Sequence, residues 1–214
     1  MDGLAWIHRG DAFVVVSKPS GLLSVPGRGE HLQDCVARRV QAEFADALVV
    51  HRLDMATSGL MLLARGSAAQ RALGIAFAQR KIEKRYVAVV AGKVPVLPGD
   101  GWGDIDLPLA ADWPNRPRQQ VDHDRGKPSL THYRIISQDR RANTTRLELR
   151  PFTGRSHQLR VHLGAIGHPI LGDTLYAPAD VQAQAGRLLL HASSLGLRYP
   201  ASGERFEFAD APPF

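Results

Sequence analysis

The chain has a single cysteine and no long apolar segment, and its acidic residues are fewer than its basic ones. Cys35 cannot form an intramolecular disulfide without a second cysteine, so a reducing compartment fits this composition. No apolar run approaches the roughly 18 residues that a membrane-spanning helix needs. The first residues do not place an apolar stretch after a charged one, as a secretory signal would. We therefore expect a soluble, cytoplasmic protein with no membrane partner.

Several motifs of nucleotide-binding, hydrolytic and metal-binding proteins are absent as well. The sequence contains no GxxxxGK[ST] or GxGxxG for holding phosphates and no GxSxG nucleophile elbow. It has no HExxH, and His157 and His162 are five residues apart, whereas two ligands on one helical face are four apart. One cysteine excludes a thiolate zinc site. We expect no metal ion.

The excess of basic residues suits an anionic partner. There are 27 lysines and arginines against 21 acidic residues, a formal charge of +6 over 214 residues. Such a charge favours nucleic acid as a partner but does not establish it, because many basic proteins bind nothing anionic. The length allows one large domain or two small ones.

Hydrophobic spacing predicts short strands joined mostly by hairpins, with few helices between them. Residues 93–128 are rich in proline and glycine and predict loops and short strands. We expect an α+β fold with a mixed, mostly antiparallel sheet and flanking helices. The predicted strands are residues 13–16, 48–50, 59–64, 84–92, 131–137, 144–152, 187–200 and 204–210, and the predicted helices are residues 30–44, 67–81 and 156–168.

A polar segment between two predicted strands raises the question of function. His51, Arg52 and Asp54 lie between the apolar residues 48–50 and 59–64. Asp54 either caps the turn before Gly59 or takes part in chemistry, since a carboxylate at such a junction must be paired, hydrated or used. "DMATSG" is weakly similar to the DxDxT of aspartate-based phosphatases, but an alanine replaces the second aspartate.

Two further clusters allow both interpretations. Tyr86 is either an ordinary strand residue or part of a site. Arg155 and Arg160 in "TGRSHQLRVH" are either a solvated helix face or part of a site. Composition and spacing alone do not decide between these roles.

Four blocks, in order, resemble the pseudouridine synthases of the RluA type. "HRLDMATSGLMLLA" is similar to their HRLDxxTSGL signature, and "KRYVAVVAG" is similar to their KxYxAxVxG segment. "TGRSHQLRVHLGAIGHPILGD" resembles their third block, and "VVVSKPSGLLSVPG" resembles their first strand and KPxG turn. The blocks cover most of the chain.

The resemblance implies that uridine in folded RNA is converted into pseudouridine without a cofactor or a metal. It implies that Asp54 is the essential catalytic carboxylate, that Tyr86 packs against the uracil and that Arg155 is the partner of Asp54. The chemistry agrees, because cutting a glycosidic bond calls for a carboxylate beside the anomeric carbon.

The same resemblance assigns residues to substrate binding. Arg52 is expected to reach the RNA as the target base leaves the stack, and we expect His51 and Thr57 to contact the substrate too. A stacked uridine must first be flipped out, which costs a few kcal/mol that phosphate contacts can offset. Basic candidates for those contacts are Arg80, Lys81, Lys84, Arg85, Arg116 and Arg118.

Three other stretches resemble a short family member that modifies both tRNA and large-subunit rRNA: "GLLSVPGR", "LPLAADWPNRPRQ" and "GRLLLHA". This implies two substrates, a tRNA anticodon stem-loop and a 23S rRNA hairpin, and no obligatory protein partner. We expect residues 1–214 to form a single catalytic domain without an S4-like RNA-binding domain. Two alternatives stay open: a catalytically idle RNA-binding protein, and a nucleoside or glycoside hydrolase, for which no second carboxylate is assigned.

Overall fold

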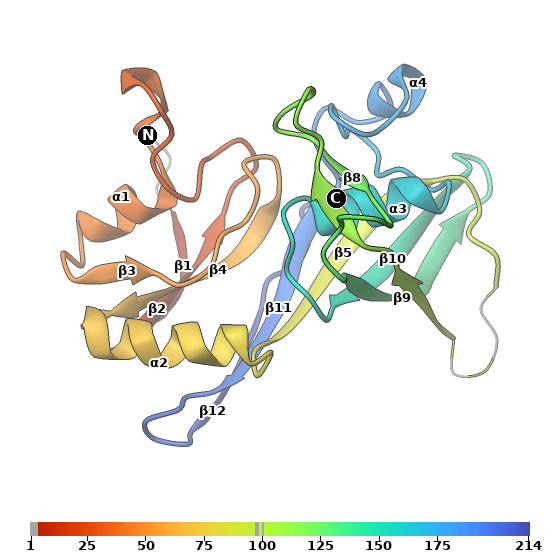
Figure 1. The fold of residues 1–214 in the computed structure, drawn as a ribbon. Coiled ribbons are helices and arrows are strands. Elements are labelled where there is room, and N and C mark those ends of the chain that lie inside the picture. Colours follow the sequence, from red (N-terminus) through yellow and green to blue (C-terminus); the bar gives the residue numbers. More distant parts are fainter. Residues whose placement is uncertain (1–3, 97–98, 100) are drawn as a thin grey trace. The chain divides into compact units, whose positions relative to one another are not determined.

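A computed structural model describes residues 4–96, 99 and 101–214 (Figure 1). The chain forms two compact units: residues 1–84 with 191–213, and residues 85–190 with 214. We call them the first and the second unit. The predicted single domain over residues 1–214 stays a prediction, and residues 97, 98 and 100 of the predicted loop lie outside the described residues.

The first unit is built on strands in the order β1-β2-β4-β11, with β3 paired to β4 and β12 paired to β11. All these pairs are antiparallel except the parallel pair of β4 and β11. The elements are β1 (Ala5–Arg9), β2 (Phe13–Lys18), the 3-10 helix η1 (Glu30–Leu32), α1 (Val36–Gln41), β3 (Ala47–Val49), β4 (Ser58–Arg65), α2 (Gly66–Ala78), β11 (Leu190–Arg198) and β12 (Arg205–Ala209).

Helix α2 supplies one side of the core of the first unit. Leu73 of α2 packs with Phe13 and Val15 of β2 and with Leu60 and Leu62 of β4, and all five are nearly inaccessible to solvent. Strand β4 is buried along almost its whole length, which explains why its sequence is a continuous apolar run and does not alternate. This core holds the segment that precedes β4 in place.

The second unit contains an antiparallel sheet in the order β5-β10-β9-β6 and a separate hairpin of β7 and β8. Helix α3 contacts β8. The elements are β5 (Glu83–Ala91), β6 (Trp102–Asp106), β7 (Leu109–Ala111), β8 (Gln119–Val121), β9 (Leu130–Asp139), β10 (Thr144–Pro151), α3 (Gln158–Ala165) and α4 (Ala179–Gln182).

The α+β class with a mixed, mostly antiparallel sheet is confirmed, but the predicted helix over residues 30–44 is wrong in extent. The chain forms only η1 and α1 there, because Cys35 has extended backbone angles and forms a bridge with Leu23. The backbone N–H of Val36 donates to the Leu23 carbonyl at 2.8 Å. The bridge between Cys35 and Leu23, twelve positions apart, thus replaces one turn of the helix that the apolar spacing predicted.

Candidate active site

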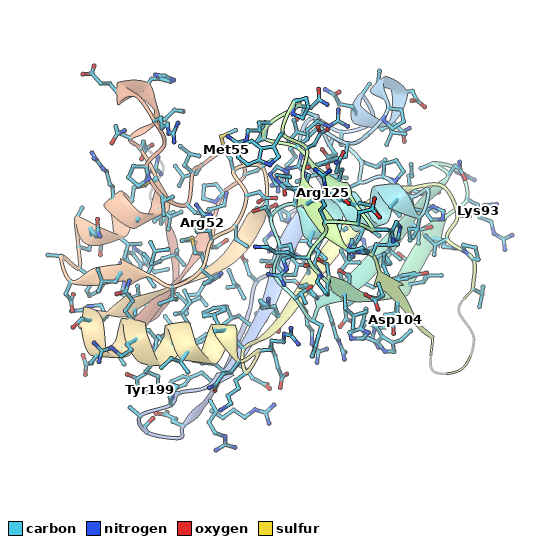
Figure 2. All side chains as sticks on the ribbon, viewed as in Figure 1. Arg52, Met55, Lys93, Asp104, Arg125 and Tyr199 are labelled. Atoms are coloured by element: carbon cyan, nitrogen blue, oxygen red, sulfur yellow. The ribbon has the colours of Figure 1, made fainter. Side chains whose placement is uncertain are left out.

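Asp54 lies on a short turn between β3 and β4, residues 53–57, which we call the Asp54 turn. Its backbone carbonyl accepts a hydrogen bond from the Thr57 N–H at 3.1 Å, which closes the turn. The Asp54 residue is partly buried, whereas its neighbours Arg52 and Met55 are exposed (Figure 2). The arrangement keeps a carboxylate at the surface of the first unit beside an exposed arginine.

A buried lysine holds the Asp54 turn through hydrogen bonds to backbone carbonyls. Lys18, at the end of β2, is inaccessible to solvent, and its Nζ donates to the carbonyls of Pro19, Leu22 and Met55 at 2.9, 2.7 and 2.9 Å. The Gly21 N–H donates to the same Met55 carbonyl at 2.8 Å. Three acceptors satisfy all three ammonium donors, which is what a buried charge requires.

Two serines of the same loop complete the support. Ser20 Oγ donates to the Ala56 carbonyl at 2.7 Å, and Ser24 Oγ donates to the Leu53 carbonyl at 2.6 Å. The Leu53 N–H in turn donates to Ser24 Oγ at 3.1 Å. Residues on both sides of Asp54 are therefore tied to the loop that follows β2. Our sequence reasoning missed this role, although a lysine ending the apolar run "FVVVSK" was a signal for it.

The first residues of β4, directly after the Asp54 turn, are held by contacts with β11. Gly59 has a φ of +109°, and a Cβ atom there would lie 2.3 Å from the Ala192 carbonyl oxygen, so only glycine fits. Beside it, the buried Ser58 Oγ lies 2.8 Å from Nδ1 of the buried His191. The other ring nitrogen of His191 lies 3.2 Å from the Asp210 carbonyl. These contacts explain the serine and the glycine that begin β4.

His51, a predicted substrate contact, has a structural partner. Its Nε2 accepts a hydrogen bond from the Leu62 N–H at 2.9 Å, and its ring stacks on Phe77 with centroids 4.6 Å apart. Burial, and secondarily the charge of Lys84, lower the pKa of His51 from 6.5 to about 3. The neutral ring therefore carries its proton on Nδ1. The substrate contact of His51 stays a prediction, as does that of the buried Thr57.

The depressed pKa of His51 predicts a pH-dependent stability. Between its folded pKa of about 3 and its unfolded value of 6.5, only the unfolded chain binds this proton. His51 therefore contributes stability above pH 6.5, and the free energy of unfolding falls by about 1.4 kcal/mol per unit as the pH drops through this window. We expect His51→Gln, which can still accept from Leu62, to show a shallower slope in urea melts between about pH 6 and pH 4.

The matched control for this measurement is His123→Gln, at an exposed position. It should keep the slope of the wild-type protein. An unchanged slope in His51→Gln would show that the ring is not held neutral in the folded state.

The second unit contains the other two predicted catalytic residues. Tyr86 is a partly buried residue of β5, paired with Leu149 of β10. Arg155 precedes α3 and is exposed; its guanidinium donates to the Pro128 carbonyl at 3.5 Å, while its backbone N–H donates to Gln158 Oε1 at 3.0 Å. The buried Gln158 thus fixes the backbone from which Arg155 projects.

Arg160 is not the solvated residue that one interpretation of the sequence allowed. It is buried, and its guanidinium donates to both carboxylate oxygens of Asp173 at 2.7 and 2.6 Å. Its guanidinium also lies 5.0 Å from the ring of Tyr176, whose hydroxyl is 2.6 Å from His157 Nδ1. This network anchors the start of α3, where His157 has a φ of +54°. No local pattern in the sequence indicated the pairing with Asp173.

Among the described residues, no group of three or more His, Cys, Asp and Glu residues is arranged to hold a metal ion. None of the described helices combines the length and the apolar character that crossing a membrane requires.

The family model described as "RNA pseudouridylate synthase" matches residues 12–165 of the chain. This protein belongs to that family. The match includes Asp54, Tyr86 and Arg155, and the predicted resemblance is confirmed. The protein is therefore an RNA pseudouridine synthase, an isomerase that acts on uridine in RNA.

Relatives of this synthase carry a more specific name. The chain is 49% identical over 205 residues to the "Dual-specificity RNA pseudouridine synthase RluA" of Escherichia coli strain K12, covering 96% of the chain and 91% of that protein. It is 46% identical over 208 residues to the protein of that name from Pasteurella multocida, covering 97% and 93%.

Solved structures agree on the fold. The structure titled "Human RNA Pseudouridylate Synthase Domain Containing 1" matches with a TM-score of 0.79 and 26% identity, covering 99% of this chain and 84% of that one. "Human RNA Pseudouridylate Synthase Domain Containing 4" matches with a TM-score of 0.74 and 24% identity, over 98% and 88%, which supports the fold alone.

Proposed function

We propose that this synthase uses Asp54 as its catalytic carboxylate and that it modifies two RNAs. The observation that carries the first part is the support of the Asp54 turn, where the backbone carbonyls of Leu53, Met55 and Ala56 are all held by the end of β2 and the loop after it. Such preorganisation holds a reacting group in place without further ordering during the reaction.

In the proposed reaction, the N1–C1′ bond of uridine breaks and a C5–C1′ bond forms. Asp54 either attacks the anomeric carbon or stabilises its developing positive charge. The detached uracil turns while an aromatic face, assigned to Tyr86, retains it. C5 then loses its proton, for which Tyr86 is the candidate acceptor, and N1 gains one, so product and substrate have the same composition. Arg52 is assigned to the RNA contact that accompanies flipping of the base.

The proposed substrates are a tRNA anticodon stem-loop and a hairpin of 23S rRNA. The support is the resemblance of the sequence to a short member of the family and the words "dual-specificity" in the names of its relatives. A cytoplasmic location, where both RNAs are present, belongs to the same proposal. Folded loops with splayed bases let one site accept two RNAs through shape and a few base contacts.

Pseudouridine mapping across total RNA tests this proposal. Cells with and without the gene are compared, and the purified protein is then given each isolated stem-loop. We expect modification to disappear from both RNAs in the cells that lack the gene. If both stem-loops stay unmodified while another RNA is converted, the substrates are wrong and the chemistry stands.

Arg155 offers a separate test of the proposed site, since the resemblance makes it the partner of Asp54. Hydrogen bonds to charged groups contribute about 1.5–3 kcal/mol, so Arg155→Ala should lower kcat about 10- to 100-fold. Arg155→Lys should restore only part of this, because lysine lacks the planar fork. Arg155 is exposed, so neither change should lower the melting temperature by more than about 3 °C.

Arg141→Ala, at an exposed position of the β9–β10 turn, is the control and should keep full kcat. If Arg155→Ala weakens RNA binding but keeps kcat, Arg155 contacts phosphate and does not act on Asp54.

A further inference from the structure

The sheet of the second unit has two chemically different faces. Along β5, Arg85 and Val87 point to one face and Tyr86 to the other, because neighbouring strand residues alternate. Tyr86 pairs with the fully buried Leu149, whereas Val87 pairs with Glu148. The face that carries Glu148 is therefore opposite the one that carries Tyr86.

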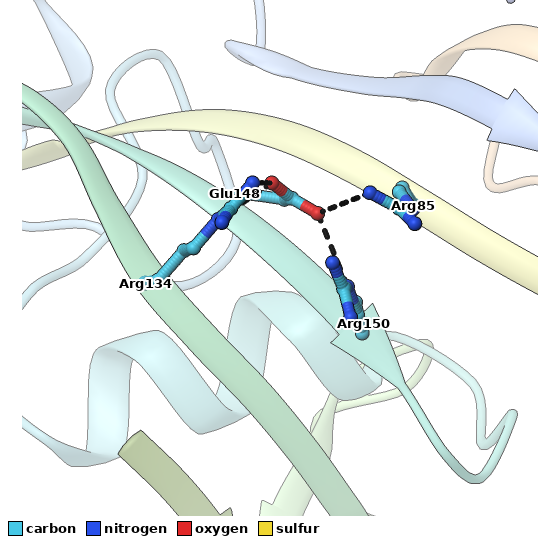
Figure 3. A network of polar contacts seen from close by, with 4 residues as sticks. All are labelled: Arg85, Arg134, Glu148 and Arg150. Atoms are coloured by element: carbon cyan, nitrogen blue, oxygen red, sulfur yellow. Dashed lines mark hydrogen bonds and ion pairs between the residues drawn. The ribbon is translucent and has the colours of Figure 1, made fainter. Parts of the chain in front are cut away.

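Three arginines from three strands meet on Glu148 (Figure 3). Arg134 Nε and Arg150 Nε donate to the carboxylate at 2.8 and 3.1 Å, and Arg85 lies 3.2 Å from it. The Glu148 side chain is only 11% exposed, but those of Arg134, Arg85 and Arg150 are 44%, 42% and 39% exposed. The carboxylate thus holds the three guanidinium groups in place while leaving much of each open to solvent.

The charges of this cluster do not balance. Burial by itself would raise the pKa of Glu148, but the hydrogen bonds from Arg134 and Arg150 hold that pKa below its usual value, so the carboxylate is ionised. One negative charge then faces three positive ones. Asp104, on the neighbouring strand, lies 2.5 Å from His132 and adds a second negative charge, so the three guanidinium groups exceed these two carboxylates by one.

Aromatic side chains lie among these basic groups. The Arg134 and Arg150 guanidinium groups lie 5.0 and 4.1 Å from the ring centroid of Trp102. His132, opposite Arg150 in the β9–β10 pair, contacts the ring of Phe152, which is 48% exposed. We call this surface the arginine face; it consists of Arg85, Trp102, His132, Arg134, Glu148, Arg150 and Phe152.

We propose that the arginine face binds the backbone and bases of a single-stranded RNA segment that lies outside the target loop. Fixed guanidinium groups match phosphate oxygens, and partly exposed aromatic rings interleaved with them are typical of surfaces on which unpaired bases stack. An acidic protein segment would match the charge, but it would not use the aromatic rings as stacking platforms. The proposal rests on the proposed function only in taking RNA as the ligand.

Binding of a short oligo(A) RNA, measured by fluorescence anisotropy at several salt concentrations, tests this proposal. The variant is Arg134→Gln with Arg150→Gln, which removes two charges and leaves Glu148 its pair with Arg85. Each phosphate contact on single-stranded RNA contributes about 0.7 to the slope of log K against log salt, so the slope should become shallower by about 1.4. Trp102→Leu should weaken binding about fivefold or more with an unchanged slope.

Arg141→Gln, which removes one exposed charge elsewhere in the second unit, is the control and should change the slope less than the single variant Arg150→Gln. The single variant is expected to lose about 0.7 of the slope and replaces the double variant if the latter melts below the assay temperature. The single and the double variant should both form pseudouridine in the isolated stem-loops at the wild-type rate.

An oligo(A) affinity and slope equal to those of the wild-type protein would overturn the proposal, as would the same slope change in Arg141→Gln. The proposal would also be overturned if the double variant kept its oligo(A) binding but no longer bound an acidic peptide that the wild-type protein binds. Failure of the wild-type protein to modify either stem-loop refutes the proposed substrates only, because oligo(A) binding does not depend on them.

Discussion

Asp54→Asn is expected to abolish pseudouridine formation while leaving the fold and RNA binding intact. Asparagine has nearly the same shape, but it can neither attack the anomeric carbon nor stabilise a positive charge there. Asp54 is not part of the apolar core, so the melting temperature should stay within about 2 °C of the wild-type value. RNA affinity should stay the same or increase, because one negative charge near a polyanion is removed.

Single-turnover conversion of a stem-loop, with protein in excess, measures this effect most directly. Asp11→Asn is the control, since Asp11 is an exposed residue before β2, and it should keep the wild-type rate. Measurable turnover by Asp54→Asn that persists after removal of wild-type contamination would refute the assignment of Asp54.

Lys18→Met should have the second largest effect, on both stability and rate. Its three hydrogen bonds to carbonyls contribute about 1.5–3 kcal/mol each, partly offset by the cost of burying the ammonium group. We expect a net loss of roughly 2–4 kcal/mol, which lowers the melting temperature by about 4–16 °C in a protein of this size. The rate should fall about 100-fold, since a displacement of about 1 Å suffices for that.

Lys93→Met is the control for this prediction, because Lys93 is exposed (Figure 2). It should change neither the melting temperature nor kcat. The role of Lys18 predicts a loss of kcat with little change in KM, measured at a temperature at which the variant is fully folded. If the folded variant keeps the wild-type kcat, Lys18 supports the fold but not the position of Asp54.

Local patterns in the sequence were sufficient to predict the helices and strands whose apolar residues recur at a regular spacing. The run "GLMLLA" predicted a buried strand, which β4 is, and the spacing of Leu73 and its neighbours predicted α2. The hairpin of β9 and β10 was also expected from two alternating segments around a polar turn. In each case the information lies within about ten residues, where apolar periodicity decides which face is buried.

Residues whose role depends on a distant partner were not predictable in this way. One interpretation of the sequence made Arg160 a solvated arginine, but it is buried and pairs with Asp173, 13 residues away. The resemblance assigns His51 to the substrate, and its local sequence did not indicate that its ring nitrogen receives a backbone N–H from β4. In both cases the sequence shows the residue type but does not show which group is its hydrogen-bond partner.

The sequence by itself determined the family and the reaction, and it predicts a site around Asp54, Tyr86 and Arg155, because the blocks around these residues are contiguous stretches whose order is visible in the chain. Only the tertiary structure decided what holds Asp54 in place and which sheet face carries exposed arginines. The contacts concerned join residues 37 positions apart at Lys18 and Met55, and 63 apart at Arg85 and Glu148. Buried polar groups must find partners wherever the folded chain supplies them, and local spacing carries no record of such partners.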